Sequence, residues 1–177
     1  MEDKRKKQHP RAVWLFFLWS LAPSLVVSIP LGFVILPTII NGQESSENFV
    51  FKLTATGIAV VALAVLVAYV WAKLTYRFYF YELRPEAFRK EHGIIWKRYT
   101  SIPYERIQNV DIYRGLIARL LGLSDINIQT AGMSAPAAGP YGAGSEGRLP
   151  GLARVEAEAI RDELIARAKG AKNHQGL

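Results

Sequence analysis

The sequence of 177 residues contains no cysteine and only three histidines. Without cysteine the chain forms no disulfide bond, iron-sulfur cluster or cysteine zinc site, and it has no thiol nucleophile. His9, His92 and His174 are scattered, and neither a carboxylate nor a second histidine stands at metal-ligand spacing from them. We therefore predict no metal site.

Charged residues and histidine are absent from two stretches, residues 12–40 and 53–72. A helix needs roughly 20 apolar residues, each adding about 1.5 Å, to cross the hydrocarbon of a bilayer. The second stretch has this length, whereas the first is longer and carries three prolines spaced seven residues apart, which bend a helix. The sequence predicts a transmembrane hairpin with spans at about 13–36 and 53–72 and an external loop at 41–52.

Lysine and arginine flank the predicted hairpin unevenly. They precede the first stretch and follow the second at Lys73 and Arg77, whereas the loop between the stretches ends with Lys52 alone. Cationic flanks favour the cytoplasmic side of a membrane, so we predict that both termini are cytoplasmic. A cleaved signal peptide would begin with similar cations, but the first apolar stretch is too long for one and no small-x-small cleavage site comes after it. Small residues of the second stretch, Ala55, Gly57, Ala59 and Ala62, are expected to let the two helices approach closely.

The basic tail, residues 1–11, holds a cationic run whose role stays open. The run consists of Lys4, Arg5, Lys6 and Lys7. In one interpretation it only fixes the orientation of the hairpin. In the other it also contacts anionic lipid headgroups, which contributes about 1 kcal/mol for each cation near the surface.

The residues after the hairpin have the pattern of a mainly-β sandwich or barrel with a helix at its C-terminal end. Aromatic residues alternate from Tyr76 to Tyr81, which predicts a first strand there, and turn residues separate further short strands. We expect these strands at 87–92, 94–102, 107–113 and 125–130, a glycine-ended helical turn at 115–122, a mobile loop at 131–147, a helix at 152–168 and a disordered tail at 170–177.

Three motifs occur in order along this domain. They are Ile-Pro-Tyr-Glu-Arg-Ile-Gln at 102–108, Gly-Leu-Ile-Ala-Arg-Leu-Leu-Gly-Leu at 115–123 and Thr-Ala-Gly at 130–132. With them the chain closely resembles the bacterial pleckstrin-homology-like (PH-like) domain of the membrane-anchored YdbS/YdbT type. The resemblance implies a domain over about 74–169, built as a seven-stranded bent sandwich with a C-terminal α-helix and preceded by a two-helix transmembrane hairpin in a bacterial inner membrane.

Nothing in the sequence resembles an active site or a small-molecule substrate site. We predict a non-enzymatic, membrane-anchored interaction or scaffold module on the cytoplasmic face of the lipid bilayer. Relatives often carry several copies of the domain, so a single copy implies a protein partner or a homo-oligomer. The alternatives are an anionic-lipid-responsive module and an accessory subunit of a membrane transport or envelope-stress complex.

Polar residues gather on the first motif and on the strand after it. We predict that they form a docking surface for a partner, because the apolar residues between them are spaced to face inward. The ordinary alternative is that they satisfy turns and neighbouring strands. The candidates are Arg106, Gln108, Asn109, Asp111 and Arg114.

Two other patterns are set aside. The glycines of residues 142–147 have the spacing of a dinucleotide-binding loop, but no strand precedes them and Pro150 would interrupt a helix after them, so no cofactor is predicted. The cations of residues 89–98 are interrupted by Glu91, and Glu86 precedes them, so nucleic-acid binding is not predicted.

Overall fold

The computed structural model describes residues 5–39, 46–131 and 147–175. The chain forms two compact units. One unit is Phe16–Leu74, and the other combines Met1–Leu15 with Thr75–Leu177. We call the first the helical unit and the second the β-unit, and each is described by itself.

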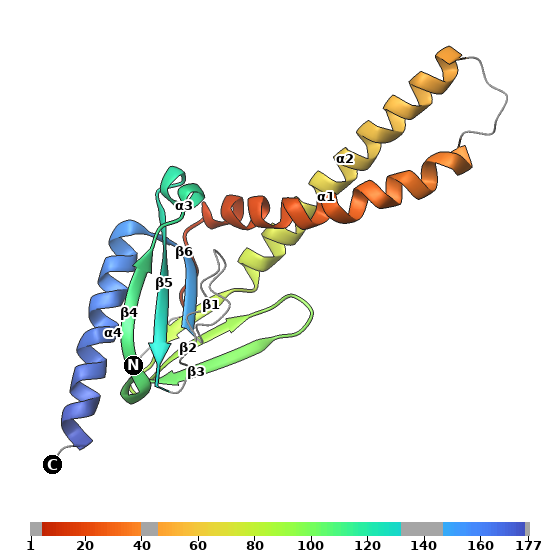
Figure 1. Ribbon diagram of the computed structural model, residues 1–177. Coiled ribbons are helices and arrows are strands. Elements are labelled where there is room, and N and C mark those ends of the chain that lie inside the picture. Colours follow the sequence, from red (N-terminus) through yellow and green to blue (C-terminus); the bar gives the residue numbers. More distant parts are fainter. Residues whose placement is uncertain (1–4, 40–45, 132–146, 176–177) are drawn as a thin grey trace. The chain divides into compact units, whose positions relative to one another are not determined.

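The helical unit is made from two long apolar helices (Figure 1), α1 (Ala12–Ile39) and α2 (Ser46–Arg77). Both are long and apolar enough to cross a membrane, over Ala12–Pro30 and Val50–Arg77. Each helix extends beyond its predicted apolar span. The three prolines do not interrupt α1.

Small residues of α2 are buried, but they are not the predicted ones. Ala64 and Ala68 are buried, whereas Gly57 and its predicted alanine neighbours are exposed. The hydroxyl of Ser20 donates a hydrogen bond to the Ala68 carbonyl at 3.0 Å. The prediction was wrong because alanine is common throughout this helix, and only the crossing of the two helices selects which alanines are covered.

The β-unit contains two antiparallel three-stranded sheets and a long C-terminal helix. We call the sheet with strand order β1-β2-β3 sheet A and the sheet with order β4-β5-β6 sheet B. In chain order the elements are β1 (Phe80–Leu83), β2 (Ala87–His92), β3 (Arg98–Pro103), the 3-10 turn η1 (Tyr104–Arg106), β4 (Ile107–Tyr113), α3 (Leu116–Leu120), β5 (Leu123–Thr130), β6 (Gly147–Ala153) and α4 (Arg154–Gln175).

The core of the β-unit lies between the two sheets and α4, and Figure 1 shows α4 running along sheet B. Phe88 and Ile102 contribute from sheet A, Ile126 and Leu149 from sheet B, and Leu164 from α4. All five are fully or almost fully buried. This arrangement confirms the predicted fold class, in which apolar helices precede a mainly-β sandwich with a C-terminal helix.

Two of the five predicted strands have the observed bounds, and the other three begin at a different residue. The strand predicted at 125–130 begins two residues earlier, at Leu123. Strands 87–92 and 107–113 have the predicted bounds, and Gly122 ends the predicted helical turn with a φ of +70°. The predicted strand from Tyr76 to Tyr81 was wrong at its start, because α2 continues to Arg77 and β1 begins at Phe80. A short apolar alternation cannot tell a strand from the last turn of a helix.

The predicted strand at 94–102 was also wrong at its start, since β3 begins at Arg98 and residues 94–97 form the connection from β2. At the C-terminus α4 continues to Gln175, into the segment expected to be a disordered tail. Ala171 still packs against the core, which supports this extension. The predicted loop at 131–147 falls almost entirely outside the described residues.

Sheet B contains a β-bulge, and a residue of this bulge is hydrogen-bonded to the segment that precedes α1. The register between β5 and β6 shifts at Asp125, and Gly151 opposite adopts a φ of +73°. The buried Asp125 carboxylate accepts hydrogen bonds from the Gly151 N–H at 3.0 Å and from the Arg148 guanidinium at 2.7 Å. The Gly151 carbonyl in turn accepts a hydrogen bond from the His9 N–H at 3.1 Å.

Candidate functional site

The segment before α1 continues sheet A at its β1 edge. Lys6 and Tyr81 form an antiparallel bridge, with N–H to carbonyl distances of 2.9 and 3.1 Å. The Tyr76 hydroxyl donates a hydrogen bond to the Gln8 carbonyl at 3.3 Å. These bonds cover part of a sheet edge that would otherwise expose unpaired backbone groups.

Two side chains of the same segment contact the outer surface of sheet A, the surface that faces away from the core. The Lys7 ammonium lies 5.3 Å from the centre of the Phe80 ring. The Arg5 guanidinium lies 3.6 Å from the Glu91 carboxylate. Most of the cationic run is therefore part of the domain surface, while Lys4 lies outside the described residues.

A cavity of about 230 Å³ opens on this outer surface. The strand register brings Glu82, Arg89 and Ser101 into one cross-strand row, because Arg89 is the partner of both other residues. The other charged residues that line the cavity are Arg5, Arg84, Lys90 and Glu91. Side chains two residues apart share a face of a strand, which is why residues from three strands and the N-terminal segment meet here.

The carboxylates of the cavity are already paired. Glu82 accepts a hydrogen bond from the Arg84 guanidinium at 2.5 Å, and Glu91 lies between Arg5 and the Lys97 ammonium, which is 3.5 Å away. Arg89 is exposed and has no ion pair within the described part of the chain. A guanidinium in this position can bind a carboxylate or phosphate through two parallel hydrogen bonds.

Behind the cavity, polar groups attach sheet A to sheet B. The Tyr79 hydroxyl donates to the Arg148 carbonyl at 2.7 Å, and the Lys90 ammonium donates to the same oxygen at 3.4 Å. Burial raises the pKa of Tyr79 well above its ordinary value, so the phenol remains a donor. Lys90 therefore directs its ammonium away from the cavity opening, and the groups that face a ligand are the arginines.

Three polar side chains form a separate cluster on the exposed surface of β4 and β5. The Asn109 amide donates to the Asp111 carboxylate at 3.0 Å, and the Gln129 amide donates to the same carboxylate at 3.0 Å. Asn109 and Asp111 were predicted docking residues, whereas Gln129 was not. Gln129 lies beside them because it is paired with Asn109 between β4 and β5, and the sequence alone does not predict this pairing.

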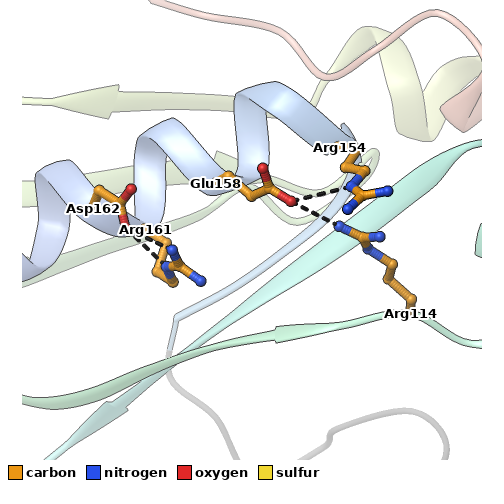
Figure 2. A network of polar contacts seen from close by, with 5 residues as sticks. All are labelled: Arg114, Arg154, Glu158, Arg161 and Asp162. Carbon is orange, nitrogen blue, oxygen red and sulfur yellow. Dashed lines mark hydrogen bonds and ion pairs between the residues drawn. The ribbon is translucent and has the colours of Figure 1, made fainter.

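The remaining predicted docking residues are dispersed. Gln108 is exposed at the register shift of β4, and Arg106 is exposed on η1. Arg114 contacts α4 instead, where its guanidinium lies 3.3 Å from the Glu158 carboxylate, as Figure 2 shows. The hydrogen bond from Arg154, together with the charges of Arg154 and Arg114, holds the pKa of Glu158 below its usual range. Whether these residues bind a partner stays a prediction.

No group of three or more histidine, aspartate or glutamate side chains that could hold a metal ion occurs in the part of the chain that the structure describes. Most of the glycine pattern at 142–147 lies outside that part. His92 is half-buried beside Tyr79, with its ring centre 5.6 Å from that of the tyrosine. It therefore serves the packing of the β-unit.

Sequence reasoning missed the cavity. In the sequence Arg89 stands in an interrupted cationic run, and Arg5 stands in a run that indicates topology or lipid contact. An alternation of charges at Glu82, Arg89 and Glu91 on strands was the available signal, but its meaning depends on which strands are neighbours.

The model of the family described as "Bacterial PH domain" matches residues 23–168. The chain belongs to this family. The chain is also similar to the UPF0699 transmembrane protein YdbT of Bacillus subtilis (strain 168), to which it is 27% identical over 168 residues. That match covers 93% of this chain but 30% of the relative, so the chain spans about a third of the relative's length. No solved structure shows a significant match.

The family match includes most of the helical unit as well as the sandwich. The family model therefore covers apolar helices as well as the β-unit, in agreement with the predicted resemblance. The name of the relative adds that it is a transmembrane protein. Together these findings describe a PH-like domain in a family of membrane-associated proteins.

Proposed function

We propose that this protein is a non-enzymatic interaction module that holds its PH-like domain at the cytoplasmic face of a bacterial inner membrane and binds an acidic segment of a protein partner. The partner is a different protein or a second copy of the chain. The cavity on sheet A carries this proposal, because it presents Arg89 without an ion pair among residues whose carboxylates are already neutralised, within the described part of the chain.

The membrane anchor in this proposal is the pair of apolar helices. They are long enough to span, and their exposed surfaces are rich in large apolar side chains such as Val26, Ile58 and Leu66. Such surfaces are unfavourable in water but not in hydrocarbon. The cationic flanks support an orientation with both termini in the cytoplasm.

The partner is recognised in the proposal by charge and shape together. An acidic side chain entering the cavity would meet Arg89 in the centre of the sheet, with Arg5 and Arg84 on either side. The ion pairs of these two arginines with glutamates keep the rim ordered, while Arg89 supplies the new charge-assisted bond.

A photo-crosslinking amino acid at Ser101, an exposed residue that lines the cavity, tests the proposal in native membranes. We expect a discrete protein adduct that Arg89→Glu reduces at least about tenfold, since a reversed charge repels an acidic segment. The matched control places the crosslinker at Lys169, on an exposed part of α4. An adduct that is insensitive to Arg89→Glu, or one that forms equally at Lys169, contradicts the proposal.

The same experiment addresses the lipid alternative. Arg5, which was predicted to contact anionic headgroups, lines the cavity beside Glu91, so a headgroup phosphate has a specific place to bind. An adduct whose added mass is that of a phospholipid would support this alternative. A protein adduct of the chain's own mass would identify a second copy as the partner.

A further inference from the structure

The connection between β2 and β3 exposes apolar side chains that the rest of the β-unit leaves uncovered. Trp96 is 84% exposed and Ile95 is 68% exposed. Gly93 begins the connection with a φ of +118°, and a Cβ there would lie 2.0 Å from the Trp96 carbonyl oxygen. The turn thus requires glycine, and it holds residues 94–97 outside the sheet. We call residues 93–97 the hairpin tip.

Leaving an indole in water is unfavourable, because its apolar surface stays hydrated. A strand connection has no need of large apolar residues, since polar turn residues would close it as well. The side chains of Ile95 and Trp96 are therefore suited to a partner surface that removes them from water.

The strand register places the hairpin tip at a particular end of the β-unit. Phe80, the first residue of β1, is paired with Glu91, and Glu91 is paired with Tyr99. The tip lies beyond these pairs, and Figure 1 shows the β2–β3 hairpin projecting past β1. Arg77, the last residue of α2, stands three positions before Phe80.

The segment that enters α1 reaches the same end of the β-unit. Lys7 lies on the ring of Phe80, and the Gln8 carbonyl is bonded to Tyr76. Both connections to the apolar helices therefore start from the end of sheet A that carries the hairpin tip. If the helices cross a membrane, chain connectivity keeps this end next to the surface of that membrane.

The charges around the tip fit an anionic surface. Lys97 and Arg98 directly follow Trp96, and both are exposed. Arg98 has no ion pair among the described residues, and Lys97 shares Glu91 with Arg5. Aromatic side chains flanked by cations are typical of the boundary between lipid headgroups and acyl chains.

We propose that the hairpin tip is a second membrane contact, which inserts Ile95 and Trp96 into the interface of the same bilayer that holds α1 and α2. Lys97 and Arg98 then lie among the headgroups and favour anionic lipids. This inference rests on the proposed membrane anchoring, but it does not depend on what the cavity binds. Its consequence is that the β-unit contacts the membrane directly as well as through the connections to α1 and α2, which limits the orientations in which the cavity is presented.

The absence of cysteine allows a direct test with single-cysteine variants of the full chain. Ile95→Cys is labelled with a polarity-sensitive fluorophore and placed in nanodiscs of phosphatidylcholine and phosphatidylglycerol, with nitroxides at shallow or deep positions of the lipids. We expect blue-shifted emission that the shallow nitroxide quenches. Lys169→Cys, on α4, is the control for a water-exposed surface, and its emission is expected to stay that of a probe in water.

A probe at Ile58→Cys, on the exposed surface of α2, reports the anchoring itself. If deep nitroxides quench Ile58→Cys while Ile95→Cys behaves like the Lys169→Cys control, the tip proposal is overturned and the anchoring stands. If Ile58→Cys is not quenched, the anchoring fails and the tip proposal fails with it. If Ile95→Cys is shielded but insensitive to both nitroxides, a protein covers the tip and the proposal is again overturned.

A second variant checks the contribution of the aromatic residue. Trp96→Ser in the Ile95→Cys background is expected to reduce quenching by the shallow nitroxide several-fold, and to leave the melting temperature unchanged because Trp96 is exposed. Lys97→Gln is expected to lower the preference for phosphatidylglycerol over phosphatidylcholine. Unchanged quenching in Trp96→Ser would overturn the role of the indole in insertion.

Discussion

Gly151 stands where sheet B meets the segment that enters α1. Its φ of +73° is a conformation that costs other residues roughly 1–2 kcal/mol, and a Cβ would lie 2.5 Å from the Cβ of Ala12. Gly151→Ala is therefore expected to lower the free energy of unfolding by at least about 1–2 kcal/mol. Thermal melting in detergent micelles, followed by near-ultraviolet circular dichroism, measures the loss.

Gly170→Ala is the matched control for that substitution. Gly170 lies in α4, and a Cβ there meets no atom within 4 Å. Alanine is favoured over glycine in a helix by roughly 0.8–1 kcal/mol, so the control is expected to be neutral or stabilising. Equal melting temperatures for Gly151→Ala and the unmodified protein would contradict the close approach of Ala12 to the bulge.

His92 is expected to make stability depend on pH. Burial, followed by the charges of Lys90 and Arg98, lowers its pKa below the ordinary value of 6.5. The unfolded chain therefore binds a proton at this histidine more readily than the folded chain does. The free energy of unfolding is thus unaffected by His92 above pH 6.5 and declines as the pH falls from 6.5 through the lowered pKa. Melting temperatures measured across this window, compared with those of His92→Asn, test the sign. A steeper decline in the variant would refute it.

At the scale of elements, the pairing of the N-terminal segment with β1 makes a distinct prediction. Lys6→Pro removes the N–H that donates to the Tyr81 carbonyl, which is expected to cost about 1 kcal/mol. Lys6→Ala keeps the donor and is the control. Hydrogen exchange measured by mass spectrometry should show faster exchange across the bridge in the proline variant only. Equal exchange rates in the two variants would mean that the bridge is absent in solution.

The elements also show how far local sequence signals reach. The two apolar helices, strands 87–92 and 107–113 and the glycine after α3 were predictable, because each depends on residues that are close in the chain. The end of α2 and the start of β3 were not, since the alternation at 76–81 and the apolar run at 94–96 fit more than one structure. Tertiary contacts decided both.

At the scale of the whole molecule, the proposed topology places residues 1–11 and the C-terminus on one side of the membrane and the loop at 41–52 on the other. Because the chain lacks cysteine, single cysteines at Asp3, Gln43 and Leu177 allow direct mapping. With a membrane-impermeant thiol reagent on intact cells, we expect labelling of Gln43→Cys alone. Labelling of Leu177→Cys before the cells are opened would refute the cytoplasmic orientation.

The sequence by itself determined the class of this protein. Two uncharged stretches, their cationic flanks and the three ordered motifs suffice for a helical hairpin and a bacterial PH domain, because hydrophobic length and local periodicity are properties of neighbouring residues. The strand that carries Asn109 and Asp111 was predictable in the same way, but the grouping of its polar side chains was not. Gln129 lies beside these two residues only because β4 pairs with β5.

Only the tertiary structure decided where the protein presents its chemistry. Arg5 forms an ion pair with Glu91, and Arg89 lies between Glu82 and Ser101 in the strand register. Both arrangements join residues that are distant in sequence. The exposure of Trp96 likewise follows from the fold, in which other side chains fill the core. An apolar residue is buried or exposed according to which surfaces the fold covers, and that is a property of the packed chain rather than of the residue.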